Sequence, residues 1–232
     1  PGTDFTDLYL DSDGSANTLF GDGWLSREGP GSGSDSFRYE PANPVPTVSS
    51  RTAGARGGIA HGSVDNRAVE TRDDVLVYTT EPLSEGMTVA GPITATIYVS
   101  TDVPDTDVTV KLLDVYPDGR ALNISHGIAR ARYRDSYGST QLLEEGEVYP
   151  IEVELYPGAN HFAEGHRIRV EVSSSNFPNF GRNLNVAGSP NTSTRMQAAN
   201  TEVHHSSEHP SHVRLPVIPD SAGGTWSPLG GP

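Results

Sequence analysis

The stretch VPDTDVTVKLLDVYPDGRALNISHGIARARYR, residues 103–134, decides the fold because it combines a strand pattern with a chain reversal. Val108, Val110 and Leu112 place apolar side chains at every second position, which is the period of a half-buried strand. The sequence Tyr-Pro-Asp-Gly at 116–119 then contains the residues that favour a tight turn. The stretch therefore predicts antiparallel β-structure.

The same two-residue period recurs along the chain, and no segment keeps the 3.6-residue period of a helix. The candidate strands, each bounded by Gly, Pro, Asp or Asn, are Phe5–Leu10, Val75–Tyr78, Ile93–Ser100, Val108–Val115, Ile128–Tyr133, Val148–Leu155, Arg167–Ser173, Thr201–His205 and Val213–Val217. We therefore predict an all-β protein, a jelly-roll β-sandwich made of two packed antiparallel sheets. Its inner faces are expected to hold Ile97, Val110, Leu112, Val153, Ile168 and Val170.

Composition supports short strands joined by long loops. Among 232 residues there are 25 Gly and 18 Pro, and only 34% are hydrophobic. We expect one β-sandwich domain over residues 1–219, in which residues 29–62 form a loop-rich connecting arm. The prolines within Tyr39–Thr47 favour an extended backbone there. Residues 220–232, rich in Gly, Ser and Pro, are expected to be a flexible tail.

Charge and cysteine content exclude several classes of function. The net charge is -14 and Lys111 is the only lysine, so we expect neither nucleic acid nor membrane as a partner. The absence of cysteine excludes disulfides and thiolate chemistry. No apolar run reaches the length that crosses a bilayer, and the N-terminus lacks the features of a signal peptide. We therefore predict a cytoplasmic location.

The sequence lacks the motifs of nucleophilic catalysis. A nucleophile elbow requires Gly-x-Ser-x-Gly, which does not occur. The segment Gly31-Ser-Gly-Ser-Asp35 has the right residue types at the wrong spacing. A Ser-x-x-Lys pair is also absent, because Val108 stands three residues before Lys111. We predict that the chain contains no catalytic residue.

One string resembles a zinc motif. His205-Ser-Ser-Glu-His209 matches the H-x-x-E-H pattern of inverted zinc metallopeptidases, and His204 and His212 are further possible ligands. That motif requires a helix, whereas this string follows a predicted strand and runs into Pro210. A polar connecting loop is the better interpretation.

Acidic residues and the remaining histidines are the other candidate metal ligands. Asp102, Asp105 and Asp107, and the pair Asp11 and Asp13, offer oxygen atoms to Ca²⁺ but lack the spacing of a calcium loop, so turn chemistry explains them better. The remaining histidines are expected on turns and strand ends: His61, His126, His161 and His166. We predict no metal ligand, no cofactor and no cofactor-binding residue.

Several further segments carry a family resemblance that extends over residues 3–219. They are Phe5-x-x-Leu8-Tyr-Leu, Tyr39–Thr47, Asp74–Leu83, Gly165–Pro178 and His204–Pro219, in addition to the opening stretch. Together they resemble the C-terminal domain of the family that includes X-Pro dipeptidyl-peptidases, cocaine esterase and α-amino acid ester hydrolases. So many ordered matches are more specific than a single motif.

The resemblance implies a function for the domain. Members of this family are serine hydrolases in which an α/β-hydrolase domain carries Ser, Asp and His, and a jelly roll similar to galactose-binding domains packs beside it. It implies that the triad lies upstream of Pro1, that this domain is non-catalytic, and that its partner is the α/β-hydrolase domain of the same chain. Its expected task is to shape the active-site entrance, with Tyr39–Thr47 as a contact. The alternative, by analogy of fold, is an independent carbohydrate-binding module.

Overall fold

The protein is described by a computed structural model over residues 2–48, 62–189 and 192–219. These residues form strands joined by loops, with one four-residue helix and one 3-10 turn. The elements are β1 (Asp4–Asp11), β2 (Trp24–Ser26), β3 (Ser32–Tyr39), α1 (Arg67–Glu70), β4 (Leu76–Thr79), β5 (Met87–Thr101), β6 (Asp107–Val115), β7 (Ala121–Arg130), η1 (Ala131–Tyr133), β8 (Tyr149–Phe162), β9 (Arg167–Ser173), β10 (Ala199–Ser206) and β11 (His212–Ile218).

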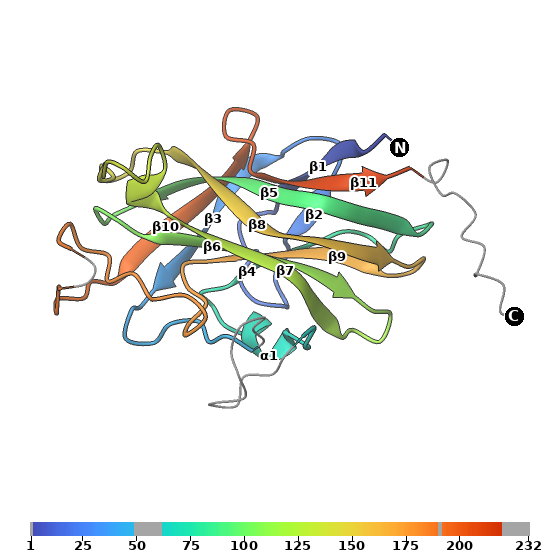
Figure 1. The fold of residues 1–232 in the computed structure, drawn as a ribbon, viewed down its shortest axis with the longest axis horizontal. Helices are drawn as coiled ribbons and strands as arrows, with labels where there is room; N and C mark the ends of the chain where they lie inside the picture. Colours follow the sequence, from blue (N-terminus) through green and yellow to red (C-terminus); the bar gives the residue numbers. More distant parts are fainter. Residues whose placement is uncertain (1, 49–61, 190–191, 220–232) are drawn as a thin grey trace, which may run out of the picture.

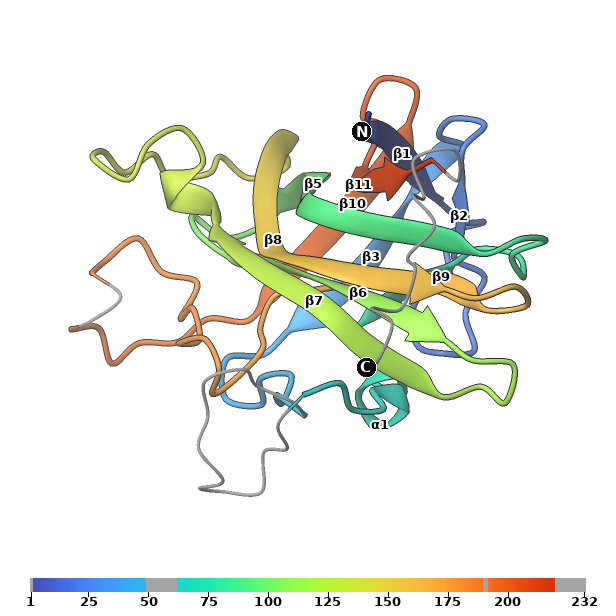
Figure 2. The ribbon, with the colours of Figure 1, turned by 45° about the vertical axis from the view of Figure 1, so that its right-hand side comes forward.

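The strands pair in the order β11-β1-β2-β4-β9-β6-β7-β8-β5-β10-β3, and β5 also pairs with β11. Hydrogen bonding thus closes a circuit from which β10 and β3 branch. Two junctions consist of a single residue pair each, Trp24 with Thr79 and Gly127 with Leu155. These weak junctions divide the circuit into two facing sheets, β4-β9-β6-β7 and β2-β1-β11-β5-β8. Figures 1 and 2 show β10 and β3 passing behind β6.

The apolar core lies between the sheets and confirms the predicted inner faces. Ile97, Val110, Leu112, Val153, Ile168 and Val170 are all buried in one cluster. The reason is the two-residue period, which places one face of every strand toward the opposite sheet. β5 keeps this alternation over most of its length. In β6, by contrast, every residue is buried, because segments outside the sandwich cover its outer face.

Two predicted elements need correction. The expected strand Ile128–Tyr133 is instead the end of β7, which begins at Ala121 and stops at Arg130, followed by the 3-10 turn η1. The expected loop-rich arm 29–62 contains a full strand, β3, which pairs with β10 over its whole length. The Gly and Ser residues of β3 mask its alternation, yet Asp35, Phe37 and Tyr39 are buried on one side.

The part of the arm after β3 packs on its own domain. The amide of Thr47 donates to the carbonyl of Phe177, and the amide of Phe177 donates to the carbonyl of Val45. Val45 is buried in a second small core with Val69, Val75 and Val77. The remainder of the predicted arm, residues 49–61 with His61, and the predicted tail, residues 220–232, lie outside the described residues.

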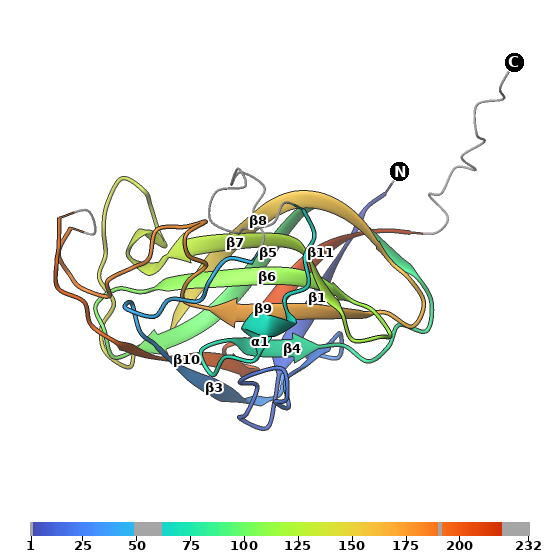
Figure 3. The same cartoon turned by 90° about the horizontal axis from the view of Figure 1, so that it is seen from below.

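The helix α1 lies against the outer face of β9, as Figure 3 shows from below, and a buried cluster of charged and polar side chains joins the two. Arg169 donates to Glu70 at 2.6 Å, and Lys111 and Asn66 donate to Glu171 at 2.8 and 2.9 Å. Burial raises the pKa of Glu70 to about 8, and the nearby carboxylate of Glu171 adds to the shift. Glu70 therefore keeps its proton at neutral pH, which avoids placing two carboxylates together in a buried site.

This cluster predicts a pH dependence of stability. A carboxyl group whose folded-state pKa is raised contributes stability below its unfolded pKa, near 4.5, and loses it as the pH rises through about 8. Between pH 5 and pH 8, we expect the free energy of unfolding to fall by about 1–2 kcal/mol less in Glu70→Gln than in wild type, since the amide cannot ionise. Urea unfolding of both proteins across this range measures the slope. Parallel slopes for Glu70→Gln and wild type would contradict the assignment.

Candidate docking surface

The structure brings Ser12, His205, Asp35 and Asp11 together, although no sequence motif joins them. Ser12 Oγ lies 3.0 Å from His205 Nε2, and His205 Nδ1 lies 3.4 Å from an oxygen of Asp11. The residues come from β1, the turn after it, β3 and β10. This arrangement has the residue types of a catalytic triad, so its chemistry needs to be examined.

The hydrogen bonds of this group do not suit nucleophilic catalysis. Ser12 Oγ donates to Asp35 at 2.7 Å rather than to the imidazole, and it accepts from the amide of Gly14. Burial lowers the pKa of His205, but the bond and the charge of Asp35 outweigh it and raise that pKa overall. A histidine whose Nε2 lies 3.1 Å from a buried carboxylate and whose pKa is raised is poorly placed to take the proton of Ser12. His205 and Asp35 therefore form a structural ion pair.

The string that matches the zinc motif, expected to be a polar connecting loop, is a strand end followed by a turn. His205 lies in β10 and its side chain is buried, and residues 207–209 form the turn that leads to β11. His209 stacks at 5.5 Å on Tyr98 and at 5.7 Å on His204. Within the described ranges, no three His, Cys, Asp or Glu side chains are placed to hold a metal ion.

The acidic residues that could have been calcium ligands accept hydrogen bonds from other parts of the chain. Asp102 accepts from the amide and side chain of Asn200, and Asp105 accepts from Arg132. Asp107 accepts from Arg130 at 2.8 and 3.0 Å. Each of these carboxylates is therefore bound by donors of the chain itself, and Asp105 and Asp107 also share the side chain of Asn183.

One histidine expected on a turn or strand end lies elsewhere. His126 is buried in the middle of β7, where its ring packs edge-on against Tyr156 at 5.2 Å and Phe180 at 5.7 Å. His161 bonds Thr88 near the end of β8, and His166, in the turn before β9, bonds Asp114. His126 is the position that sequence reasoning missed, because its partner Phe180 is distant along the chain.

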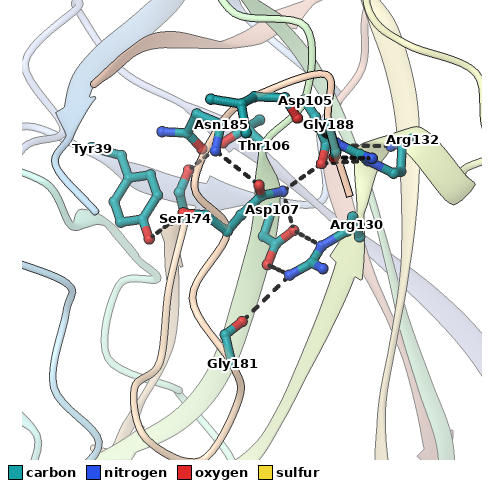
Figure 4. Close-up of polar contacts among 12 residues, drawn as sticks. Tyr39, Asp105, Thr106, Asp107, Arg130, Arg132, Ser174, Gly181, Asn185 and Gly188 are labelled. Carbon is teal, nitrogen blue, oxygen red and sulfur yellow. Dashed lines mark hydrogen bonds and ion pairs between the residues drawn. The ribbon is translucent and has the colours of Figure 1, made fainter. Parts of the chain in front are cut away.

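A buried polar cluster fastens the segment that follows β9 onto β6 and β7 (Figure 4). Asn183 donates to Asp105 and Asp107, both at 2.8 Å, while its carbonyl accepts from the Tyr39 hydroxyl at 3.0 Å. Arg132 holds the carbonyls of Val186 and Gly188 at 2.5 and 3.0 Å. Burial raises the pKa of Asp107, and the hydrogen bonds from Arg130 and Asn183 oppose this rise. Residues 183–188 are thereby bound to β3, β6 and η1.

The fastened segment forms one wall of a groove that we call the β7 groove, defined by His126, Ile128, Tyr133, Tyr137, Tyr156 and Phe180. It consists of two adjoining hollows of about 280 and 310 Å³, which share Ile128 and Phe180. Arg130 and its buried partner Asp107 lie in the second hollow. Tyrosine and phenylalanine side chains therefore line both hollows, together with the exposed carboxylate of Glu154 in the first.

The β7 groove is connected to the Pro-rich arm. The amide of Asn179 donates to Thr47 Oγ1 at 3.2 Å, and the side chain of Asn179 lies 3.0 Å from His126 Nε2. Phe177, beside Pro46 in a bridge, is exposed, as are Tyr156 and Tyr137. Exposed aromatic side chains are thus found beside the arm, at the β7 groove and near η1.

These features define an all-β domain that carries exposed aromatic side chains beside a groove on β7. The chain belongs to the family of X-Pro dipeptidyl-peptidase C-terminal non-catalytic domains, which matches residues 1–214. It is 42% identical over 221 residues to cocaine esterase of Rhodococcus sp. (strain MB1 Bresler), covering 94% of this chain and 38% of that protein.

Solved structures agree with this membership. An α-amino acid ester hydrolase superposes with a TM-score of 0.81 at 32% identity, covering 92% of this chain and 36% of the other. An aminopeptidase from a marine sediment archaeon, Thaumarchaeota archaeon, superposes with a TM-score of 0.79 at 30% identity, covering 93% and 37%. The chain thus spans under two fifths of the length of these relatives. No helix in the described part of the chain is long and apolar enough to cross a membrane.

Proposed function

We propose that this chain is the non-catalytic C-terminal domain of a serine hydrolase and packs on the α/β-hydrolase domain of the same polypeptide through the β7 groove. The observation that carries this proposal is the exposed aromatic surface of a domain that corresponds to 38% of cocaine esterase. The remaining 62% of such a relative supplies the partner. The parent protein would cleave an ester or amide by nucleophilic acyl transfer, and this domain would be inert by itself.

The chemistry of the groove supports a protein partner. Aromatic side chains and arginine are enriched in interface centres, while lysine and acidic residues are depleted there. The β7 groove offers three tyrosines and a phenylalanine, and its one arginine, Arg130, is already neutralised by Asp107. A partner therefore gains apolar contact along these rings, and the one exposed carboxylate that it would meet among the described lining residues is Glu154.

The arm gives this domain a route to the active-site entrance. Residues 40–48 are fixed against the segment around Phe177, and Pro46 remains exposed beside it. A hydrolase domain seated on the β7 groove would therefore also contact the arm. We infer that the arm forms part of the entrance wall.

A chimaera tests the proposal. This chain would replace the corresponding 38% of cocaine esterase, and hydrolysis of 4-nitrophenyl butyrate would be measured together with thermal stability. We expect the chimaera to be active and the isolated chain to be inactive. Tyr137 is 92% exposed in the isolated chain, and the docked hydrolase domain would cover it. Tyr137→Asp should therefore lower the melting temperature and activity of the chimaera, because it places a carboxylate in that interface.

The matched control is Phe20→Asp, which changes an aromatic side chain that is 83% exposed outside the groove. Both variants should melt like wild type in the isolated chain, since neither side chain is buried there. Equal effects of the two substitutions on the chimaera would refute docking through the groove. Turnover by the purified isolated chain would refute the non-catalytic assignment.

A carbohydrate-binding module is the second candidate, favoured by the ring pair Tyr133 and Tyr137 with centroids 6.2 Å apart, a surface on which a sugar ring can stack. The two functions predict different results. A binding module would show saturable affinity of the isolated chain for a glycan that Tyr137→Asp abolishes. The docking proposal predicts no such affinity.

A further inference from the structure

A separate cavity of about 350 Å³ opens at the end of the sandwich where β5 begins and β11 ends, on the right in Figure 1. Its apolar wall is made by Leu8, Leu25, Met87 and Ile168, which are all buried core residues. It therefore reaches between the two sheets. No function described above uses this cavity, and it shares no lining residue with the β7 groove.

The cavity is lined by one side chain of each charge. Arg27 and Glu85 are both exposed members of its lining. Arg27 is unusual among the described arginines, since most of them bind a carboxylate, whereas its guanidinium contacts Met87 Sδ at 3.4 Å. In the described part of the chain, neither Arg27 nor Glu85 has an ion-pair partner. Their charges are therefore available to a ligand.

A cavity that has an apolar wall of core residues, and one cation and one anion in its lining, matches a zwitterion with an apolar body. We propose that this cavity binds an α-amino acid with a large apolar side chain, with its carboxylate toward Arg27 and its ammonium group toward Glu85. The volume is at the lower end of the range for small-molecule sites, which suits a ligand of this size. The apolar side chain would lie against Leu8, Leu25 and Ile168, where water is excluded.

The two methionines of the chain provide a direct readout. Met87 lines the cavity, and Met196 is 48% exposed and lies outside it. Protein labelled with ¹³C at the methionine methyl groups is titrated with L-phenylalanine, 3-phenylpropionate and phenethylamine, and both methyl signals are followed by NMR. We expect L-phenylalanine to shift the Met87 signal saturably and to leave Met196 unchanged. Each single-charge analogue should bind roughly tenfold more weakly, because it loses one charge-assisted contact.

Variants separate the two charges. Arg27→Gln should weaken the binding of L-phenylalanine and 3-phenylpropionate roughly tenfold without affecting that of phenethylamine. Glu85→Gln should weaken the binding of L-phenylalanine and phenethylamine roughly tenfold without affecting that of 3-phenylpropionate. Arg195→Gln, outside the cavity lining, is the control and should change nothing. An unmoved Met87 signal, equal movement of Met196, or equal affinity of all three probes would overturn the proposal. This result is independent of the chimaera, which tests the opposite end of the domain.

Discussion

Asp35→Ala is expected to lower the free energy of unfolding by about 3–5 kcal/mol, because it removes one partner of a buried ion pair. The Asp35 carboxylate is fully buried and accepts hydrogen bonds from Ser12 Oγ, the amide of Ala16 and the Tyr78 hydroxyl. It also lies 3.1 Å from His205 Nε2. Without it, three donors lose this acceptor and His205 loses its buried counter-charge.

Thermal or urea unfolding of the purified variant measures this loss. Asp13→Ala is the matched control, since Asp13 lies close in the sequence but is exposed, and a change within about 0.5 kcal/mol is expected there. If Asp35→Ala and Asp13→Ala unfolded alike, the cluster would not stabilise the fold.

The size of the Asp35 effect should depend on pH. Burial raises the pKa of Asp35, but its hydrogen bonds lower that pKa by more, so the pKa is lowered overall. Its contribution to stability is therefore present above pH 3.8 and is lost as the pH falls through the lowered pKa. His205 has a raised pKa, so its contribution is present below 6.5 and is lost as the pH rises through the raised value. The difference between wild type and Asp35→Ala is therefore expected to be larger at pH 5 than at pH 9.

Arg132→Leu is expected to cost about 3–4 kcal/mol, because the fully buried carboxylate of Asp105 would lose its charged partner. The carbonyls of Val186 and Gly188 would also lose their donors. The effect should extend beyond global stability. The segment around residues 183–188 is expected to exchange its amide hydrogens faster, since Arg132 fastens it to η1.

Unfolding experiments and hydrogen exchange by mass spectrometry measure the two effects. Arg38→Leu is the control, because Arg38 forms an exposed pair with Glu40 at 3.4 Å, which contributes about 0–1 kcal/mol. Unchanged exchange in the 183–188 segment of Arg132→Leu would show that this arginine does not hold the segment. A loss no larger than that of Arg38→Leu would contradict its structural role.

The core could be predicted from sequence because it follows from a local rule. A strand places alternate side chains on opposite faces, so the pattern of Val108, Val110 and Leu112 states which residues face inward before any partner strand is known. β9 was predicted with its observed bounds for the same reason. Where Gly and Ser hide the alternation, as in β3, the rule has no apolar signal to read.

The candidate sites could not be predicted in this way. Asp35 and His205 are 170 positions apart, and Asp105 and Asn183 are 78 apart, yet both pairs are in hydrogen-bond contact. The ordered family motifs include His205 and Asp105 but not their partners Asp35 and Asn183. Nothing in a local pattern states which donor a buried carboxylate will meet.

The sequence by itself determined the all-β class, the inward faces of the main strands and the membership of a family of non-catalytic domains. Only the tertiary structure decided that Asp105 and Asp107 bind Arg132 and Arg130 rather than a common ion, and that His126, Tyr156 and Phe180 meet in one groove. The physical reason is range. Side-chain alternation acts between neighbours in the chain, whereas ion pairs and grooves form between segments that only the packing of the two sheets brings together.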